Sequence, residues 1–201
     1  MMRMMRMARI GLRRLRRDTR GIAAVEFALV APVLVVMLIG AIDVSRAVAL
    51  NQRVSLVTQM VADLAARETQ LTAADVQAIY DIAGLAMAPY STDDLEISII
   101  PVMSSTTDAT NSVVYPSTTN RPTHPTGSEL PVCHPYPLAE GLLGTNESVI
   151  VVETKYKYTP LWARQVLTAD TWQKTAYAKP RKTLCVGFDG PNCATSCFSG
   201  S

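Results

Sequence analysis

The sequence lacks the short motifs by which many enzymes are recognised. Its 201 residues contain no Gly-x-Ser-x-Gly turn, no glycine-rich phosphate loop and no His-Glu-x-x-His zinc motif. Cys133 and His134 are neighbours, but nothing in the sequence marks the acid or amide that would complete a nucleophilic site. We therefore expect a protein that is not an enzyme, and keep an anchored enzyme as the alternative.

Histidine is also scarce, and the cysteines do not have the spacing of metal ligands. The two histidines, His124 and His134, both lie in the stretch 116–137, which holds six of the twelve prolines and is predicted to be a loop. No Cys-x-x-Cys pair occurs. This pattern disfavours a zinc site, and we predict no metal and no cofactor.

Charged residues make up only 18% of the chain and hydrophobic residues 48%, a composition typical of a membrane-anchored globular protein. The charge is also uneven. Residues 1–21 hold eight arginines and one aspartate, whereas the other residues carry 11 basic and 16 acidic groups. A basic segment that lacks interleaved aromatic residues and abuts an apolar run indicates a cytoplasmic flank of a membrane helix rather than a nucleic-acid site.

The apolar run covers residues 22–42 and is long enough to cross a bilayer. At about 1.5 Å per residue it reaches roughly 31 Å as a helix. We predict a basic cytoplasmic leader at 1–21, a single transmembrane helix at 22–42, bent by Pro32, and an extracytoplasmic remainder. A cleaved secretory signal is the competing interpretation, because Ala47-Val48-Ala49 has a small-x-small form.

One acid, Glu26, interrupts the apolar run. It is the fifth residue after the junction between Gly21 and Ile22. This resembles the class III signal of type IV pilins and pseudopilins, which a prepilin peptidase cuts after a glycine. Cleavage after Gly21 would create a cationic amino group at Ile22, which a carboxylate of an adjacent subunit could neutralise. In the alternative, Glu26 lies at the headgroup boundary.

The segment "RGIAAVEFALVAPVLVVMLIGAIDVSRA" narrows the resemblance. Arg20-Gly21, the core 24–28, the Pro32 interruption and the exit motif Gly40-x-x-Asp43-x-x-Arg46 are similar to the TadE-like family, the minor pseudopilins of tight-adherence (Flp) pilus systems. The later segments "VTQMVADLAAR" and "LTAADVQAIYDIAGLAMAPY" are also similar to such proteins.

The resemblance implies a structural component of a tight-adherence type IV pilus, held in the bacterial inner membrane by a single helix with its N-terminus in the cytoplasm. It implies processing at Gly21 and Ile22 and assembly through Glu26 and Phe27. The implied partners are the membrane, other pilin and pseudopilin subunits, the prepilin peptidase and the pilus assembly platform, and not nucleic acid. The alternatives are an uncleaved, membrane-anchored pilus assembly factor, and a secreted or anchored binding domain or enzyme that uses the helix only for targeting.

Beyond the membrane, residues 43–67 are predicted to continue the helix. An apolar seam recurs there at steps of three and four: Ala47, Leu50, Val54, Val57, Val61 and Leu64. The seam fits either a free stalk or a helix that lies on its own domain. Asp43 and Arg46, three residues apart, are predicted to form an interfacial ion pair of small energy.

Residues 68–201 are predicted to form an extracytoplasmic head, so that the chain as a whole is α+β. A second helix is expected over 72–87, begun by a capping box of Thr72 and Asp75 and ended by Pro89. The head is expected to contain an antiparallel sheet, with strands at 95–103, 112–115, 148–158 and 170–178, the third half-buried and the fourth the last in the chain, and a short helix at 161–167.

The four cysteines, Cys133, Cys185, Cys193 and Cys197, all lie in the part predicted to be outside the cytoplasm. An oxidising compartment favours two disulfides, for which three connectivities are possible. Because three of the cysteines crowd the C-terminal tail, we expect one bridge within the tail and one from Cys133 to it.

Overall fold

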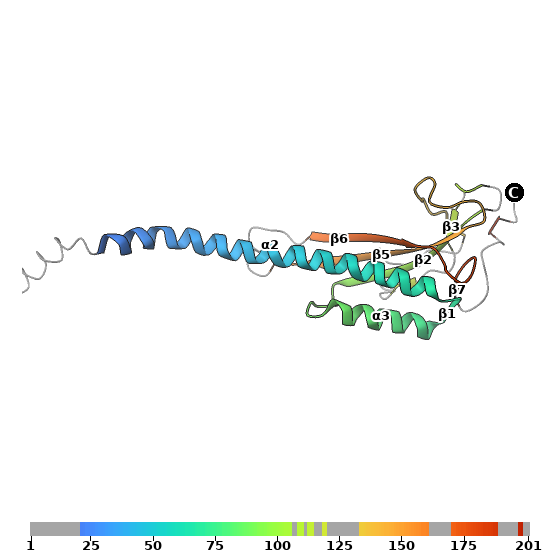
Figure 1. Ribbon diagram of the computed structural model, residues 1–201, viewed down its shortest axis with the longest axis horizontal. Coiled ribbons are helices and arrows are strands. Elements are labelled where there is room, and N and C mark those ends of the chain that lie inside the picture. Colours follow the sequence, from blue (N-terminus) through green and yellow to red (C-terminus); the bar gives the residue numbers. More distant parts are fainter. Residues whose placement is uncertain are drawn as a thin grey trace, which may run out of the picture. The chain divides into compact units, whose positions relative to one another are not determined.

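A computed structural model describes residues 21–105, 108–110, 112–114, 118–119, 133–160, 170–188 and 197–198. The chain divides into two compact units, Met1–Ser45 and Arg46–Ser201. The architecture is α+β, with a long apolar helix, a second helix and an antiparallel sheet (Figure 1), as the sequence predicts.

The first helix, α2 (Ile22–Arg67), runs for 46 residues with Pro32 inside it. Its most apolar window of 18 residues has a mean hydropathy of 2.7, and none of that window is buried. Among the described residues it is the one helix long and apolar enough to cross a membrane. The predicted helical continuation to Arg67 is confirmed.

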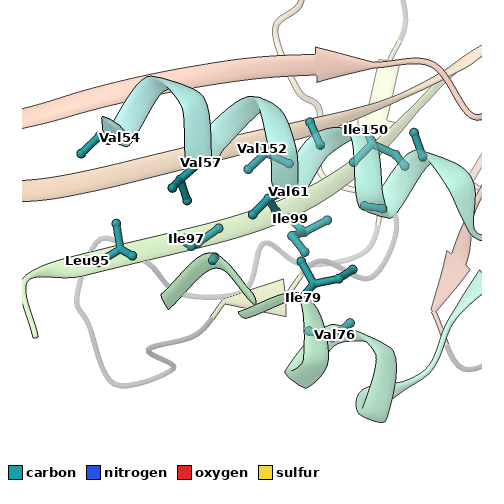
Figure 2. Packing of buried hydrophobic residues seen from close by; sticks show 14 of the residues in the cluster. Val54, Val57, Val61, Val76, Ile79, Leu95, Ile97, Ile99, Ile150 and Val152 are labelled. Carbon is teal, nitrogen blue, oxygen red and sulfur yellow. The ribbon is translucent and has the colours of Figure 1, made fainter. Parts of the chain in front are cut away.

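The second half of α2 packs on the sheet of its own domain. Val54, Val57 and Val61 are fully buried, and Figure 2 shows them among the buried side chains of the strands. On those strands, Ile97, Ile99, Ile150 and Val152 belong to the same hydrophobic cluster. Of the two interpretations of the apolar seam, the structure therefore shows the helix lying on its own domain.

The second helix, α3 (Ala73–Met87), begins as predicted. The Thr72 hydroxyl accepts a hydrogen bond from the Asp75 amide at 3.2 Å, and the Thr72 amide donates to the Asp75 carboxylate at 3.0 Å, which completes the capping box. At the other end, the Arg53 guanidinium donates to the Ala86 carbonyl at 3.0 Å. This bond satisfies one of the carbonyls that a helix C-terminus leaves unpaired, and it ties α3 to α2.

The main sheet is antiparallel, with the strand order β3-β2-β5-β6 and β4 paired to β2. Its strands are β2 (Leu95–Ser104), β3 (Ser112–Val114), β4 (Thr118–Thr119), β5 (Ser148–Tyr158) and β6 (Asp170–Ala178). The four predicted strands are confirmed within a residue at each end. The predicted short helix at 161–167 lies outside the described residues, as does most of the predicted loop 116–137. Within that loop, residues 118–119 form the strand β4, which the sequence does not predict.

The prediction that β5 is half-buried is wrong for its first half. Val149 and Val151 face away from the main cluster yet are buried, because they form a second cluster with Ile100, Val102 and Leu143. The segment that follows Cys133 supplies this cover: Tyr136 packs against the second cluster and its hydroxyl donates to the Glu153 carboxylate at 2.5 Å. Burial and the adjacent Glu153 carboxylate raise the pKa of Tyr136 above its ordinary value.

A second, two-stranded sheet joins distant parts of the chain. β1 (Gln70–Leu71), between the two helices, pairs in parallel with β7 (Gly187–Phe188). The prediction that residues 170–178 form the last strand is therefore wrong. A strand of two residues is too short to show a periodicity in the sequence.

The chain between β6 and β7 is anchored to α2 and to β5. The Arg181 amide donates to the Ala66 carbonyl at 3.0 Å, and its guanidinium pairs with the Asp63 carboxylate. Lys179 pairs with Glu147 at 2.7 Å, and the Ser148 hydroxyl donates to the Leu184 carbonyl at 2.5 Å.

Replacing a fully buried strand residue is expected to weaken the head strongly. Ile99→Ala removes a side chain with no exposed surface from the main cluster and should lower the free energy of unfolding by about 2–5 kcal/mol. Leu85→Ala, at a side chain that is 78% exposed on α3, is the control and should change it little. Urea unfolding of the detergent-solubilised chain measures both, and equal losses in the two variants would contradict the described core.

The Asp63–Arg181 contact is expected to depend on pH. Hydrogen bonds from Arg67, together with the charges of Arg67 and Arg181, lower the pKa of Asp63 below its ordinary value of 3.8. A lowered pKa adds stability above the unfolded value, and this stability is lost as the pH falls through the folded value. The parent should therefore melt slightly above Asp63→Asn at pH 6, and the difference should shrink as the pH falls below 3.8 and through the lowered pKa of the folded state. A difference that persists in acid would exclude this carboxylate as its source.

Candidate processing and assembly segment

Gly21 directly precedes α2, and the fold does not require a glycine at this position. A Cβ atom built on Gly21 has no neighbour within 4 Å among the described residues. Ile22, on the other side of the peptide bond, is 62% exposed. No described residue therefore covers the bond between them, and the described fold gives no reason for a glycine at this position.

Glu26 is the fifth residue of α2, so it lies outside the first turn, which contains no acid. Pairing with the free amides at the N-terminus of the helix therefore does not explain why an acid stands at this position. The side chain is exposed, and residues 22 and 26, four apart, lie on one face of the helix. Phe27 beside it is 67% exposed.

The first half of α2 exposes nearly all of its large apolar side chains. Those exposed are Ile22, Val25, Phe27, Leu29, Val30, Val33, Leu34, Val35, Val36, Met37, Leu38, Ile42 and Val44. Pro32 removes one backbone donor within this stretch, which leaves the Ala28 carbonyl without its usual partner four residues on. A continuous apolar surface of this size needs lipid or protein to cover it.

Asp43 and Arg46, the predicted interfacial pair, differ in their surroundings. Asp43 is buried, with 3% of its surface exposed, whereas Arg46 is exposed. An ion pair between the two residues stays a prediction.

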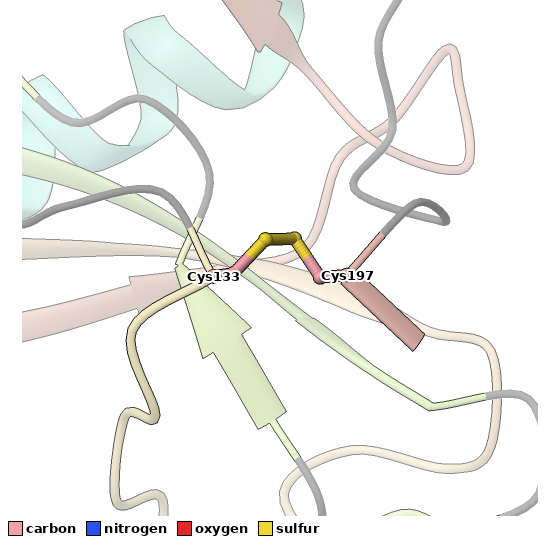
Figure 3. Close-up of a disulfide and its surroundings, with 2 residues drawn as sticks. All are labelled: Cys133 and Cys197. Atoms are coloured by element: carbon pink, nitrogen blue, oxygen red, sulfur yellow. A yellow bond between two sulfur atoms is a disulfide. The ribbon is translucent and has the colours of Figure 1, made fainter. Parts of the chain in front are cut away.

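A disulfide ties the C-terminal tail to the head. Cys133 is bonded to Cys197, 64 residues further on, with Cα atoms 5.3 Å apart (Figure 3). Cys185 is also disulfide-bonded. Cys193 lies outside the described residues, and no described cysteine is free.

Protein taken from the cell envelope with its thiols blocked is expected to contain no free cysteine. It should also change its mobility on a denaturing gel after reduction, because opened loops make the unfolded chain less compact. Mass spectrometry of alkylated peptides gives the count. Four free thiols in envelope material would contradict both the bridges and an extracytoplasmic head.

Sequence reasoning did not find the contacts of Arg181. Its partner Asp63 is 118 residues away, and no local sequence pattern links the two residues. Among the described residues, no three histidine, cysteine, aspartate or glutamate side chains are grouped to hold a metal ion. His134 is exposed, and His124 lies outside the described residues.

Comparison with known families finds a match along α2. The family model TadE, described as TadE-like protein, matches residues 21–69. The match begins at Gly21 and ends two residues beyond Arg67, so it coincides with the helix and confirms the resemblance recognised in the sequence. No curated protein and no solved structure matches the chain.

Proposed function

We propose that this chain, which is TadE-like over residues 21–69, is a pseudopilin of a tight-adherence pilus. Its role is structural: it inserts into the inner membrane through α2 and helps to assemble the pilus. The observation that carries the proposal is the coincidence of the family match with a helix that exposes nearly all of its large apolar side chains between residues 22 and 44. A helix that served only as an anchor would need an apolar stretch. It would not need a single acid, Glu26, as the fifth residue after Gly21, a glycine that the described fold does not require.

The topology of the proposal follows from charge. Eight arginines precede the helix, and cationic flanks stay in the cytoplasm. The head, residues 68–201, is then on the far side of the inner membrane, in the periplasm or outside the cell. Disulfides at Cys133, Cys185 and Cys197 support this placement, because cytoplasmic thiols are kept reduced.

In the proposal, neighbouring subunits pair through Ile22 and Glu26, which lie about one helical turn apart. A prepilin peptidase cuts after Gly21, and the new amino group of Ile22 lies about 6 Å along the axis from Glu26. A neighbouring helix shifted by about one turn brings its own Ile22 beside this carboxylate. Two charges that are each costly in lipid then neutralise one another, which makes the packed state more favourable than the single subunit.

Replacing the helix tests whether α2 assembles the pilus or only anchors the head. In a strain that lacks the chain, the full sequence should restore surface pili. A chimera in which residues 22–44 come from an unrelated single-span anchor of equal length and orientation should reach the membrane, as shown by fractionation, but should not restore pili. Full piliation by the chimera would favour the alternative, a binding domain or enzyme that uses the helix only for targeting.

A further inference from the structure

We infer that the C-terminal segment, residues 179–188 with 197–198, is a redox-controlled clasp that the Cys133–Cys197 disulfide closes over an already folded head. The inference rests on the proposed export of the head, because export moves the cysteines from a reducing compartment to an oxidising one. It makes closure of the tail the last step in completing the head.

The clasp bridges elements that are far apart in the sequence. Arg181 reaches the end of α2 through the Ala66 carbonyl and the Asp63 carboxylate. Immediately after α2, β1 receives β7 as its parallel partner. The tail therefore fastens the end of α2 and the link to α3, where Leu71 is fully buried.

The clasp also covers apolar surface. Val186 is 1% exposed and belongs to the main hydrophobic cluster. Cys185 is buried in a separate cluster with Met103 and Val113, against which Cys197 and Phe198 pack. Release of the tail would uncover this end of β2 and β3.

The ion pair and the strand pairing of the clasp are individually weak. Its ion pair with Asp63 is largely exposed, with 61% and 34% of the two side chains accessible, and such pairs contribute little. Its strand pairing has two residues on each side. The Cys133–Cys197 bond closes a span of 64 residues, so it removes much of the freedom that an open tail would gain.

The rest of the head does not depend on the clasp. β2 and β5 share nine paired positions, β5 and β6 share nine more, and none involves the tail. The contacts of α2 and α3 with the sheet are built from residues that precede Lys179, with Val186 as the tail's own contribution. Reduction should therefore open the tail and leave the helices and the main sheet in place.

Closure is a thiol–disulfide exchange. A thiolate of one cysteine attacks a disulfide oxidant, a protein or small-molecule disulfide, to form a mixed disulfide and release one thiol of the oxidant. The second cysteine then displaces the remaining thiol, so that two electrons and two protons pass from the pair to the oxidant. In a reducing compartment the cysteines stay as thiols and the clasp stays open until export.

Limited trypsin digestion of the full chain in detergent tests the clasp. The bonds after Arg181 and Lys182 report on the tail, and those after Lys155 and Lys157 in β5 report on the sheet. Reduction with dithiothreitol, followed by alkylation, should speed cleavage after Arg181 and Lys182 by about ten-fold or more, since proteolysis follows the population of the open form. Cleavage in β5 should not change.

Two results would overturn the inference. If cleavage after Arg181 and Lys182 is unchanged once mass spectrometry shows complete reduction, the tail is held without the bridges. If cleavage in β5 rises in parallel, the bridges hold the whole head rather than a clasp.

A variant provides the same test without reductant. Cys133→Ala with Cys197→Ala should open the tail in an oxidising buffer and leave β5 protected, whereas a tail that stays protected would contradict a covalent closure. The assay contains no pilus component, so its failure would leave the proposed pseudopilin role standing. Conversely, a failure of α2 to support piliation would not alter the digestion pattern.

Discussion

Replacing Glu26 by glutamine is expected to abolish pilus assembly while the protein still enters the membrane and loses its leader. Insertion should be at least as efficient as in the parent, because the change removes a charge from an apolar segment. Leader removal should persist because Gly21 and Ile22 are intact. Assembly should fail because the amino group of a neighbouring Ile22 is then buried without a partner, a defect of about 3–5 kcal/mol.

Cross-linking of the processed protein to pilus partners and the yield of surface pili measure this effect. Glu26→Ala should behave in the same way, and Glu26→Asp should keep partial function because it retains the charge on a shorter side chain. Glu140→Gln makes the same chemical change at an exposed acid of the head and is the matched control. Normal cross-linking and normal piliation in Glu26→Gln would contradict a role of the acid in assembly. They would favour the alternative that Glu26 lies at the headgroup boundary.

Replacing Gly21 by leucine is expected to block leader removal almost completely. A peptidase must bring its catalytic groups close to the backbone at the cut site, so alanine should be tolerated poorly and leucine worse. The fold itself should be unaffected, since no described atom lies within 4 Å of a Cβ built on this residue. The variant should therefore remain in the membrane and be heavier than the parent by the mass of the leader.

Gly40→Leu is the matched control for processing. Gly40 lies within α2, and a Cβ built there, like one built on Gly21, meets no described atom within 4 Å. Immunoblots of membrane fractions should show Gly40→Leu trimmed like the parent and Gly21→Leu untrimmed. Efficient trimming of Gly21→Leu would show that the peptidase does not recognise this bond.

The sequence predicts the elements whose signals are local. The capping box of Thr72 and Asp75 locates the start of α3, and the alternation along residues 148–158 locates β5. The apolar seam predicts a helix to Arg67, but an amphipathic helix can bury its seam against its own domain or against a neighbour. Only the packing of Val54, Val57 and Val61 decides between these.

The features that sequence reasoning misses depend on contacts between distant segments. Val149 and Val151 look like one face of a half-buried strand, and only the return of the chain through Tyr136 covers that face. The pairing of β1 with β7 and the anchor of Arg181 on Asp63 join residues more than 100 positions apart. Neither feature has a local pattern, because two-residue strands and exposed ion pairs need no particular neighbours in sequence.

The N-terminal residue of the mature protein tests the central claim most directly. Protein purified from the cell envelope, subjected to N-terminal sequencing and intact mass measurement, is predicted to begin at Ile22. An intact arginine-rich leader would contradict processing and support an uncleaved assembly factor. A start at Leu50, after Ala47-Val48-Ala49, would remove the membrane-spanning half of α2 and contradict the pseudopilin role altogether.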